Sequence, residues 1–99
     1  WEFFVAPNRD LVCVNKLATN RNLTEVHILS AQSNYQDFVL NTSTALGDTS
    51  ANWQFAIADN RDLFAISKGG TGSNSTEVHI LSAAEKYRNK VHKIALLPI

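Results

Sequence analysis

The chain repeats itself at an offset of 52 residues. Trp1-Glu2-Phe3 corresponds to Trp53-Gln54-Phe55, and the eight residues Thr24–Ala31 recur without change as Thr76–Ala83. So long a run of identities is not a chance event, and a period near 50 residues is typical of repeat architectures. The sequence therefore predicts two copies of one structural unit, residues 1–52 and residues 53–99.

Each copy predicts four short β-strands. Trp53–Ala58 alternates large apolar side chains with smaller or polar ones, which is the period of a strand, and Leu63–Ser67 is apolar up to its final serine. Glu77–Leu81 is the expected third strand, and the stretch from Tyr87 to Leu97 is expected to carry the fourth. In the first copy, the fourth strand is expected over Tyr35–Leu40. No segment has the length and periodicity of a convincing helix, so the fold class is all-β.

Four strands in about 50 residues match one blade of a β-propeller. Two blades cannot cover both of their faces, because natural propellers close a ring of about 4 to 8 blades. Three copies of the chain would supply six blades and four copies would supply eight, so we expect a homo-oligomeric ring. Alternatively, the missing blades belong to a longer protein of which this chain is a piece. A β-trefoil-like fold remains the second architecture to consider.

The repeated residues also resemble a known family. The pattern from Ala58 to Ile66, a loop rich in Gly, Ser and Thr, the segment Thr76–Ala83 and then Tyr87 is similar to the repeats of FG-GAP or VCBS-type propellers. Lectins of the Psathyrella velutina lectin type belong to that group. The resemblance covers nearly the whole chain and implies a non-catalytic lectin with repeated sugar sites between blades. A propeller module for protein interaction or scaffolding is the alternative.

Members of the group often carry a calcium loop after the first strand, but this chain departs from that pattern. Its turns, Pro7–Asp10 and Asp59–Asp62, are short, contain an arginine and lack glycine. Calcium requires six to eight oxygen ligands in a flexible loop. We therefore expect no metal and no other cofactor, and we interpret Asp10 and Asp62 as partners of the arginines or as acceptors within the turns.

Carbohydrate sites usually combine an aromatic surface with planar polar groups. The candidate sugar-binding residues are Trp1, Asn8, Arg9, Asp10, His27 and Tyr35 in the first copy, and Trp53, Asn60, Arg61, Asp62, His79 and Tyr87 in the second. Core packing is an equal interpretation for the tryptophans and the favoured one for the tyrosines. The pairs Glu25/His27 and Glu77/His79 each share one face of a strand. We expect them to join neighbouring blades by hydrogen bonds rather than to act as acid and base, so no catalytic residue is predicted.

The amino-acid composition argues against several classes of binding partner. Nine basic and nine acidic residues leave no net charge, so no broad field would attract nucleic acid. No apolar run approaches the roughly 20 residues that span a bilayer, so membrane insertion is not expected. Cys13 is the only cysteine, which excludes an internal disulfide and favours a small buried core residue. The sequence predicts a soluble protein and leaves its compartment open, with the outside of the cell as one candidate.

Overall fold

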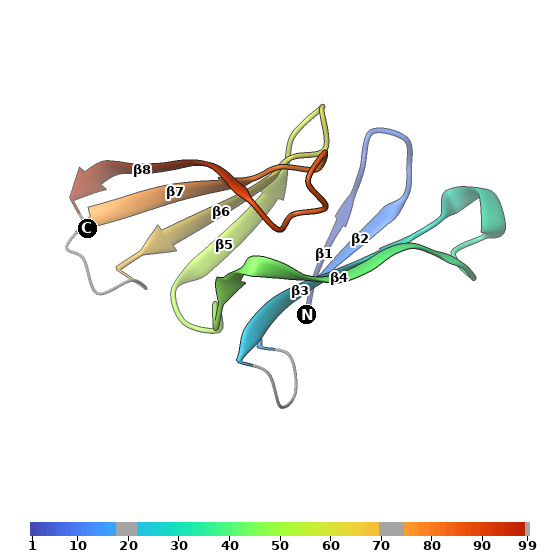
Figure 1. Cartoon of the computed structure of the whole chain (residues 1–99), viewed down its shortest axis with the longest axis horizontal. Coiled ribbons are helices and arrows are strands. Elements are labelled where there is room, and N and C mark those ends of the chain that lie inside the picture. Colours follow the sequence, from blue (N-terminus) through green and yellow to red (C-terminus); the bar gives the residue numbers. More distant parts are fainter. Residues whose placement is uncertain (18–21, 70–74, 99) are drawn as a thin grey trace.

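The chain folds into two four-stranded antiparallel sheets in a computed structural model that describes residues 1–17, 22–69 and 75–98, with side chains through residue 91 (Figure 1). In each sheet, strands that follow one another in the sequence are neighbours. The first sheet contains β1 (Glu2–Val5), β2 (Leu11–Asn15), β3 (Leu23–Leu29) and β4 (Phe38–Gly47). The second contains β5 (Trp53–Ile57), β6 (Leu63–Lys68), β7 (Ser75–Leu81) and β8 (Lys90–Pro98). The predicted all-β class is confirmed.

The fourth strand of each sheet begins later than the sequence suggested. Asn34 and Tyr35 have φ values of 56° and 65°, and their counterparts Lys86 and Tyr87 have values of 56° and 62°. These left-handed residues reverse the chain after β3 and after β7, so the tyrosines lie in the connecting loops and not in the strands. A short 3₁₀ turn, η1 (Ala31–Ser33), precedes the first of these pairs. β4 also continues past Leu40 to Gly47.

The two sheets pack against each other through opposite faces. In β3 the buried positions are Thr24, Val26 and Ile28, whereas in β7 they are Glu77, His79 and Leu81, which match the other face of β3. Side chains of the two faces form one core, which includes Val12, Val14, Val26 and Ile28 of the first sheet and Trp53, Phe55, Leu63, Ala65 and Leu81 of the second. The turns β1–β2 and β5–β6 lie at the same side of the molecule (Figure 1). The two copies therefore stack in the same orientation.

Polar contacts join the sheets around this core. The Lys16 ammonium group donates to the carbonyl of Trp53 at 2.9 Å, forms an ion pair with Glu2 and lies 5.8 Å from the centre of the Phe55 ring. A second bond comes from β4, where the backbone N–H of Ala45 donates to the carbonyl of Tyr87 at 3.1 Å. These bonds fix how the second sheet is seated on the first.

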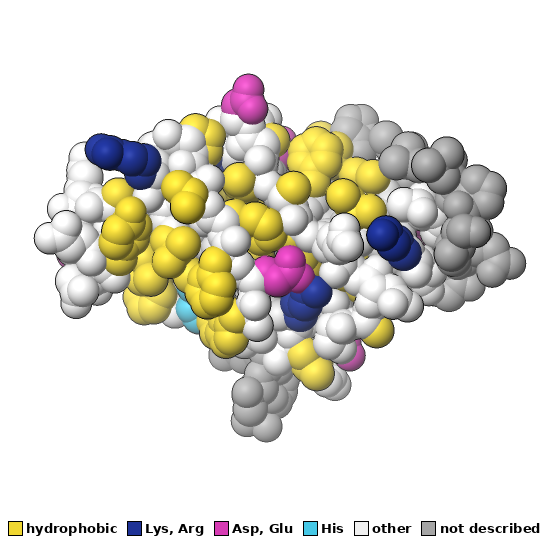
Figure 2. Space-filling view, turned by 180° about the vertical axis from the view of Figure 1, so that it is seen from behind, with side chains coloured by type: hydrophobic (Ala, Val, Ile, Leu, Met, Phe, Trp, Pro, Cys, Tyr) yellow, Lys and Arg dark blue, Asp and Glu magenta, His cyan; other side chains and the backbone are white. Residues whose placement is uncertain are grey.

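Because each copy buries only one of its faces, each sheet leaves one apolar face uncovered. On the first sheet we call this the leading face, formed by Trp1, Phe3, Cys13, Leu29 and Phe38, which line an apolar hollow of about 300 Å³ together with His27. Figure 2 shows hydrophobic side chains gathered over the end of the molecule that the first copy forms. On the second sheet we call it the trailing face, formed by the half-buried Phe64, Ile66, Val78 and Ile80.

The opposite burial of equivalent residues predicts opposite effects of equivalent substitutions. Phe55 is 6% exposed and Phe3 is 61% exposed. We expect Phe55→Ala to lower the free energy of unfolding by about 3 to 5 kcal/mol, because it opens a cavity in the core. Phe3→Ala, measured by urea unfolding in dilute solution, is expected to change it by less than about 1 kcal/mol. Equal losses for the two variants would contradict the packing described here.

Candidate functional site

The turn that ends the first strand pair of each sheet is held by its own side chains. In the first copy, Asn8 Oδ1 accepts the Asp10 N–H at 3.1 Å, and Asn8 Nδ2 donates to Asp10 Oδ2 at 3.1 Å. Asp10 Oδ1 then accepts the N–H of Ala31, in the loop after β3, at 2.8 Å. The second copy repeats these three bonds through Asn60, Asp62 and Ala83. Both aspartates are thus turn acceptors, which was one of the two interpretations of the sequence.

The arginine inside each turn contributes first through its backbone. Arg9 and Arg61 have φ values of 74° and 72°, and their carbonyls accept the hydroxyls of Tyr35 at 3.1 Å and of Tyr87 at 2.8 Å. In each sheet, the tyrosine and the aspartate therefore both connect this turn to the loop that follows the third strand. Both guanidinium groups remain at the surface. The turn and the tyrosine form a clamp that places an arginine at the rim of each sheet.

The two copies of this clamp differ in their surroundings. Tyr87 is 2% exposed because the first sheet covers it, whereas Tyr35 is 44% exposed. This burial raises the pKa of Tyr87 above its ordinary value of 10.0, since the phenolate would lose its hydration. Packing of the sheets, and not the local sequence, therefore distinguishes the two tyrosines.

The tryptophans differ in the same way. Trp53 is 7% exposed and its ring lies 5.0 Å from that of His79, inside the core between the sheets. Trp1 is 61% exposed, with its ring 5.1 Å from that of His27. The structure places Trp53 in the packing role that the sequence left open, while Trp1 stays on the uncovered leading face.

Each histidine is hydrogen-bonded to the glutamate two residues before it. His79 Nε2 lies 3.0 Å from Glu77 Oε1, and His27 Nε2 lies 3.1 Å from Glu25 Oε1. In the second sheet the pair lies on the face that packs against the first sheet, and in the first sheet it lies on the leading face. In both sheets this bond joins two residues of the same strand, so that a hydrogen bond from these pairs to a neighbouring sheet stays a prediction.

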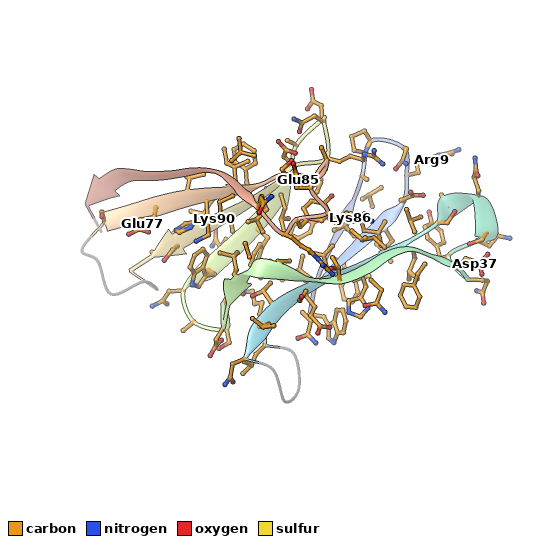
Figure 3. The ribbon with its side chains drawn as sticks, in the orientation of Figure 1. Arg9, Asp37, Glu77, Glu85, Lys86 and Lys90 are labelled. Carbon is orange, nitrogen blue, oxygen red and sulfur yellow. The ribbon has the colours of Figure 1, made fainter. Side chains whose placement is uncertain are left out.

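A hollow of about 170 Å³ lies between the two sheets. Its lining comes from Ile28, Val39 and Leu40 of the first sheet and from Arg61, Ala83, Lys86 and Tyr87 of the second. Figure 3 shows Lys86 on the loop before β8, at the junction with β4, whereas Arg9 lies at the far end of the first sheet. The hollow has an apolar floor and two cationic groups at its wall. We call it the junction hollow.

Only two of the twelve predicted residues, Arg61 and Tyr87, line the junction hollow. Asn60 and Asp62 line a different hollow of about 470 Å³ beside the trailing face, together with Ala58, Asp59, Phe64, Ile80 and Val91. Repetition in the sequence does not point to Lys86, because the corresponding residue of the first copy is Asn34.

A polar hollow of about 440 Å³ also opens beside the Glu25/His27 pair. Asn41, Thr42, Ser43 and Arg88 complete its lining, and Arg88 Nε donates to Thr42 Oγ1 at 2.9 Å. Glu77 and His79, the counterparts of Glu25 and His27, are covered by the first sheet. The polar hollow therefore lies on a face that is covered in the other copy, which makes it a weaker candidate for a ligand site than the junction hollow.

No group of three or more His, Cys, Asp or Glu side chains is placed to hold a metal ion among the described residues. In the same part of the chain, no helix is long and apolar enough to cross a membrane. Comparison of the chain with protein-family models, curated proteins and solved structures gives no match. The resemblance to propeller lectins therefore remains an expectation from the sequence.

The clamp predicts a difference between two tyrosine variants. Tyr87→Phe removes a buried hydrogen bond, so we expect the free energy of unfolding to fall by about 0.5 to 1.5 kcal/mol. The raised pKa of Tyr87 stabilises the fold fully below about pH 10, and this stability is lost as the pH rises through the folded-state pKa. Tyr87→Phe should therefore also flatten the alkaline loss of stability, as followed by urea unfolding between neutral and alkaline pH. Tyr35→Phe, at the exposed copy, serves as the control and should have the smaller effect.

A second prediction concerns metal removal. The carboxylates of Asp10 and Asp62 are already used as acceptors within the clamps. We expect EDTA to leave the melting temperature and any ligand binding unchanged. A clear drop in melting temperature after chelation, reversed by calcium, would show that these turns hold a metal.

Proposed function

We propose that this chain is a non-catalytic, carbohydrate-binding lectin whose repeats act as propeller blades, with sugar bound in the junction hollow. The observation that carries the proposal is the lining of this hollow, where apolar side chains of one repeat face Arg61 and Lys86 of the next. Small polar ligands are bound by pockets of this composition, in which a few polar groups fix orientation. The small volume suits a single sugar residue better than a larger organic ligand.

The groups of the junction hollow have separate roles in this proposal. Ile28, Val39 and Leu40 offer the apolar floor for the C–H face of a sugar ring. Arg61 and Lys86 supply N–H donors for its hydroxyl oxygens. Tyr87 is buried and its hydroxyl is bonded to the Arg61 carbonyl, so it shapes the wall and holds the arginine in place.

The proposal includes closure of the ring by three or four copies of the chain. Its support is that each sheet leaves one apolar face uncovered and that propellers contain about 4 to 8 blades. A ring presents several sugar sites on one molecule, and multivalent binding to a surface raises avidity by about 10² to 10⁴. Agglutination of glycan-coated particles is the activity that this arrangement would serve.

The test is a glycan array followed by titration with the sugar that binds best. Lys86→Asn places at position 86 the residue found at position 34, which tolerates the same left-handed backbone. We expect it to weaken sugar binding by the junction hollow by about 10- to 150-fold, since a hydrogen bond to a charged group contributes about 1.5 to 3 kcal/mol. Lys90→Gln, at an exposed lysine outside the hollow, is the matched control and should bind as the parent does.

Two results would contradict the lectin proposal. One is sugar binding that is identical in the parent and in Lys86→Asn, which would remove the junction hollow from the site. The other is a folded, assembled protein that binds nothing across the array, which would favour the alternative of a protein-interaction module.

A further inference from the structure

The leading face and the trailing face are the two halves of an interface that the chain already contains. Trp1 and Phe3 on the leading face are exposed, yet their counterparts Trp53 and Phe55 are buried against the first sheet. Ile66 and Ile80 on the trailing face correspond to Val14 and Ile28, which are buried against the second sheet. The residues that form the leading face of the first sheet are thus buried at the equivalent positions of the second sheet. The residues that form the trailing face of the second sheet are buried at the equivalent positions of the first.

We propose that the trailing face of one chain docks onto the leading face of a second copy and repeats the packing seen between the two sheets of one chain. The two faces differ in composition, and in the packing within the chain each kind of face meets the other kind, so the contact is head-to-tail. Such heterologous contacts form rings when the rotation closes. The packing within the chain shows that one pair of these faces already fits, which supplies the partner as a second copy of the chain.

The polar contacts at the edge of the core have counterparts at the proposed interface. Lys16 binds the Trp53 carbonyl and lies over the Phe55 ring. Its counterpart is Lys68, which is exposed at the end of β6 on the second sheet. In the docked pair, Lys68 of one chain would reach the carbonyl of Trp1 and the ring of Phe3 of the next chain.

The interface also completes a second ligand hollow, and this part of the inference rests on the proposed function. The hollow beside the trailing face is lined by Ile80 and Val91, the counterparts of Ile28 and Val39 in the junction hollow. It lacks the wall that Arg61, Lys86 and Tyr87 supply within one chain. Arg9, Asn34 and Tyr35 of the second copy are their counterparts and would form this wall. The second site is therefore incomplete until two chains meet, and it carries asparagine where the first carries lysine.

Two single-face variants test the docking directly. Phe3→Asp places a carboxylate on the leading face, and Ile66→Asp places one on the trailing face. We expect the parent to exceed the 11.0 kDa mass of one chain in light scattering, and each variant alone to run as a single chain. An equal mixture of the two variants retains one intact face of each kind and should form a dimer of twice that mass. A far-UV circular dichroism spectrum like that of the parent verifies that each variant is folded.

Lys68→Glu provides a second trailing-face variant, because its exposed side chain lies outside the core of its own chain. This variant alone should assemble less strongly than the parent. Mixed with Phe3→Asp, it should form a dimer, as Ile66→Asp does. A parent that stays at one chain mass would overturn the inference, as would a variant that assembles alone or a mixture that remains at one chain mass. Assembly of either variant alone would indicate that one face pairs with itself.

Sugar titration separates this inference from the proposed function. The assembled parent is expected to bind two sugars per chain, in the junction hollow and in the hollow completed by the neighbour. Phe3→Asp alone should bind one. If docking and ring closure are wrong but the junction hollow does bind sugar, a single-chain parent binds one sugar. If the lectin proposal is wrong but docking is right, the mixture forms the dimer and the array remains silent.

Discussion

The structure depends on one constraint, which is that two nearly identical sheets bury opposite faces against each other. A strand presents alternate residues to its two sides, so one repeat sequence has to provide two complementary surfaces at once. Val26 fills the core from the first sheet, while its counterpart Val78 lies on the trailing face. His79 of the second sheet is buried against the first sheet, while His27 lies on the leading face. The core, the junction hollow and the two uncovered faces all follow from this arrangement.

Repetition marks the framework of this protein more strongly than it marks a ligand site. The Asn-Arg-Asp turn and the tyrosine occur in both copies and form the same clamp, with matching backbone angles and matching hydrogen bonds. In the lining of the junction hollow, by contrast, the repeats differ at Lys86, whose counterpart is Asn34. Residues kept the same in both repeats thus hold the sheets in shape.

The sequence predicted the strand-rich class and four strands per copy. Both the repeat and the alternation of apolar and polar residues can be recognised in short stretches of sequence, without knowledge of which segments pack together. It could not predict which face of each sheet is covered, since Trp1 and Trp53 stand in matching segments and differ only in their tertiary neighbours. The same limit applies to Tyr35 and Tyr87. The fourth strands were placed too early because the left-handed pair before them, Asn34 and Tyr35 in the first copy, has no glycine to announce it. Lys86 could not be identified from the repeat, because the corresponding residue of the first copy is Asn34.

The match between the two faces also bears on how a gene of this kind can change its length. The segments Thr24–Ala31 and Thr76–Ala83 are identical, so unequal recombination between them would insert or delete one whole repeat. A chain lengthened in this way gains a sheet whose neighbours are already complementary to it on both sides. A shortened chain still ends in one leading and one trailing face. Evolution can therefore vary the number of sheets encoded in one chain without having to devise a new surface at each step.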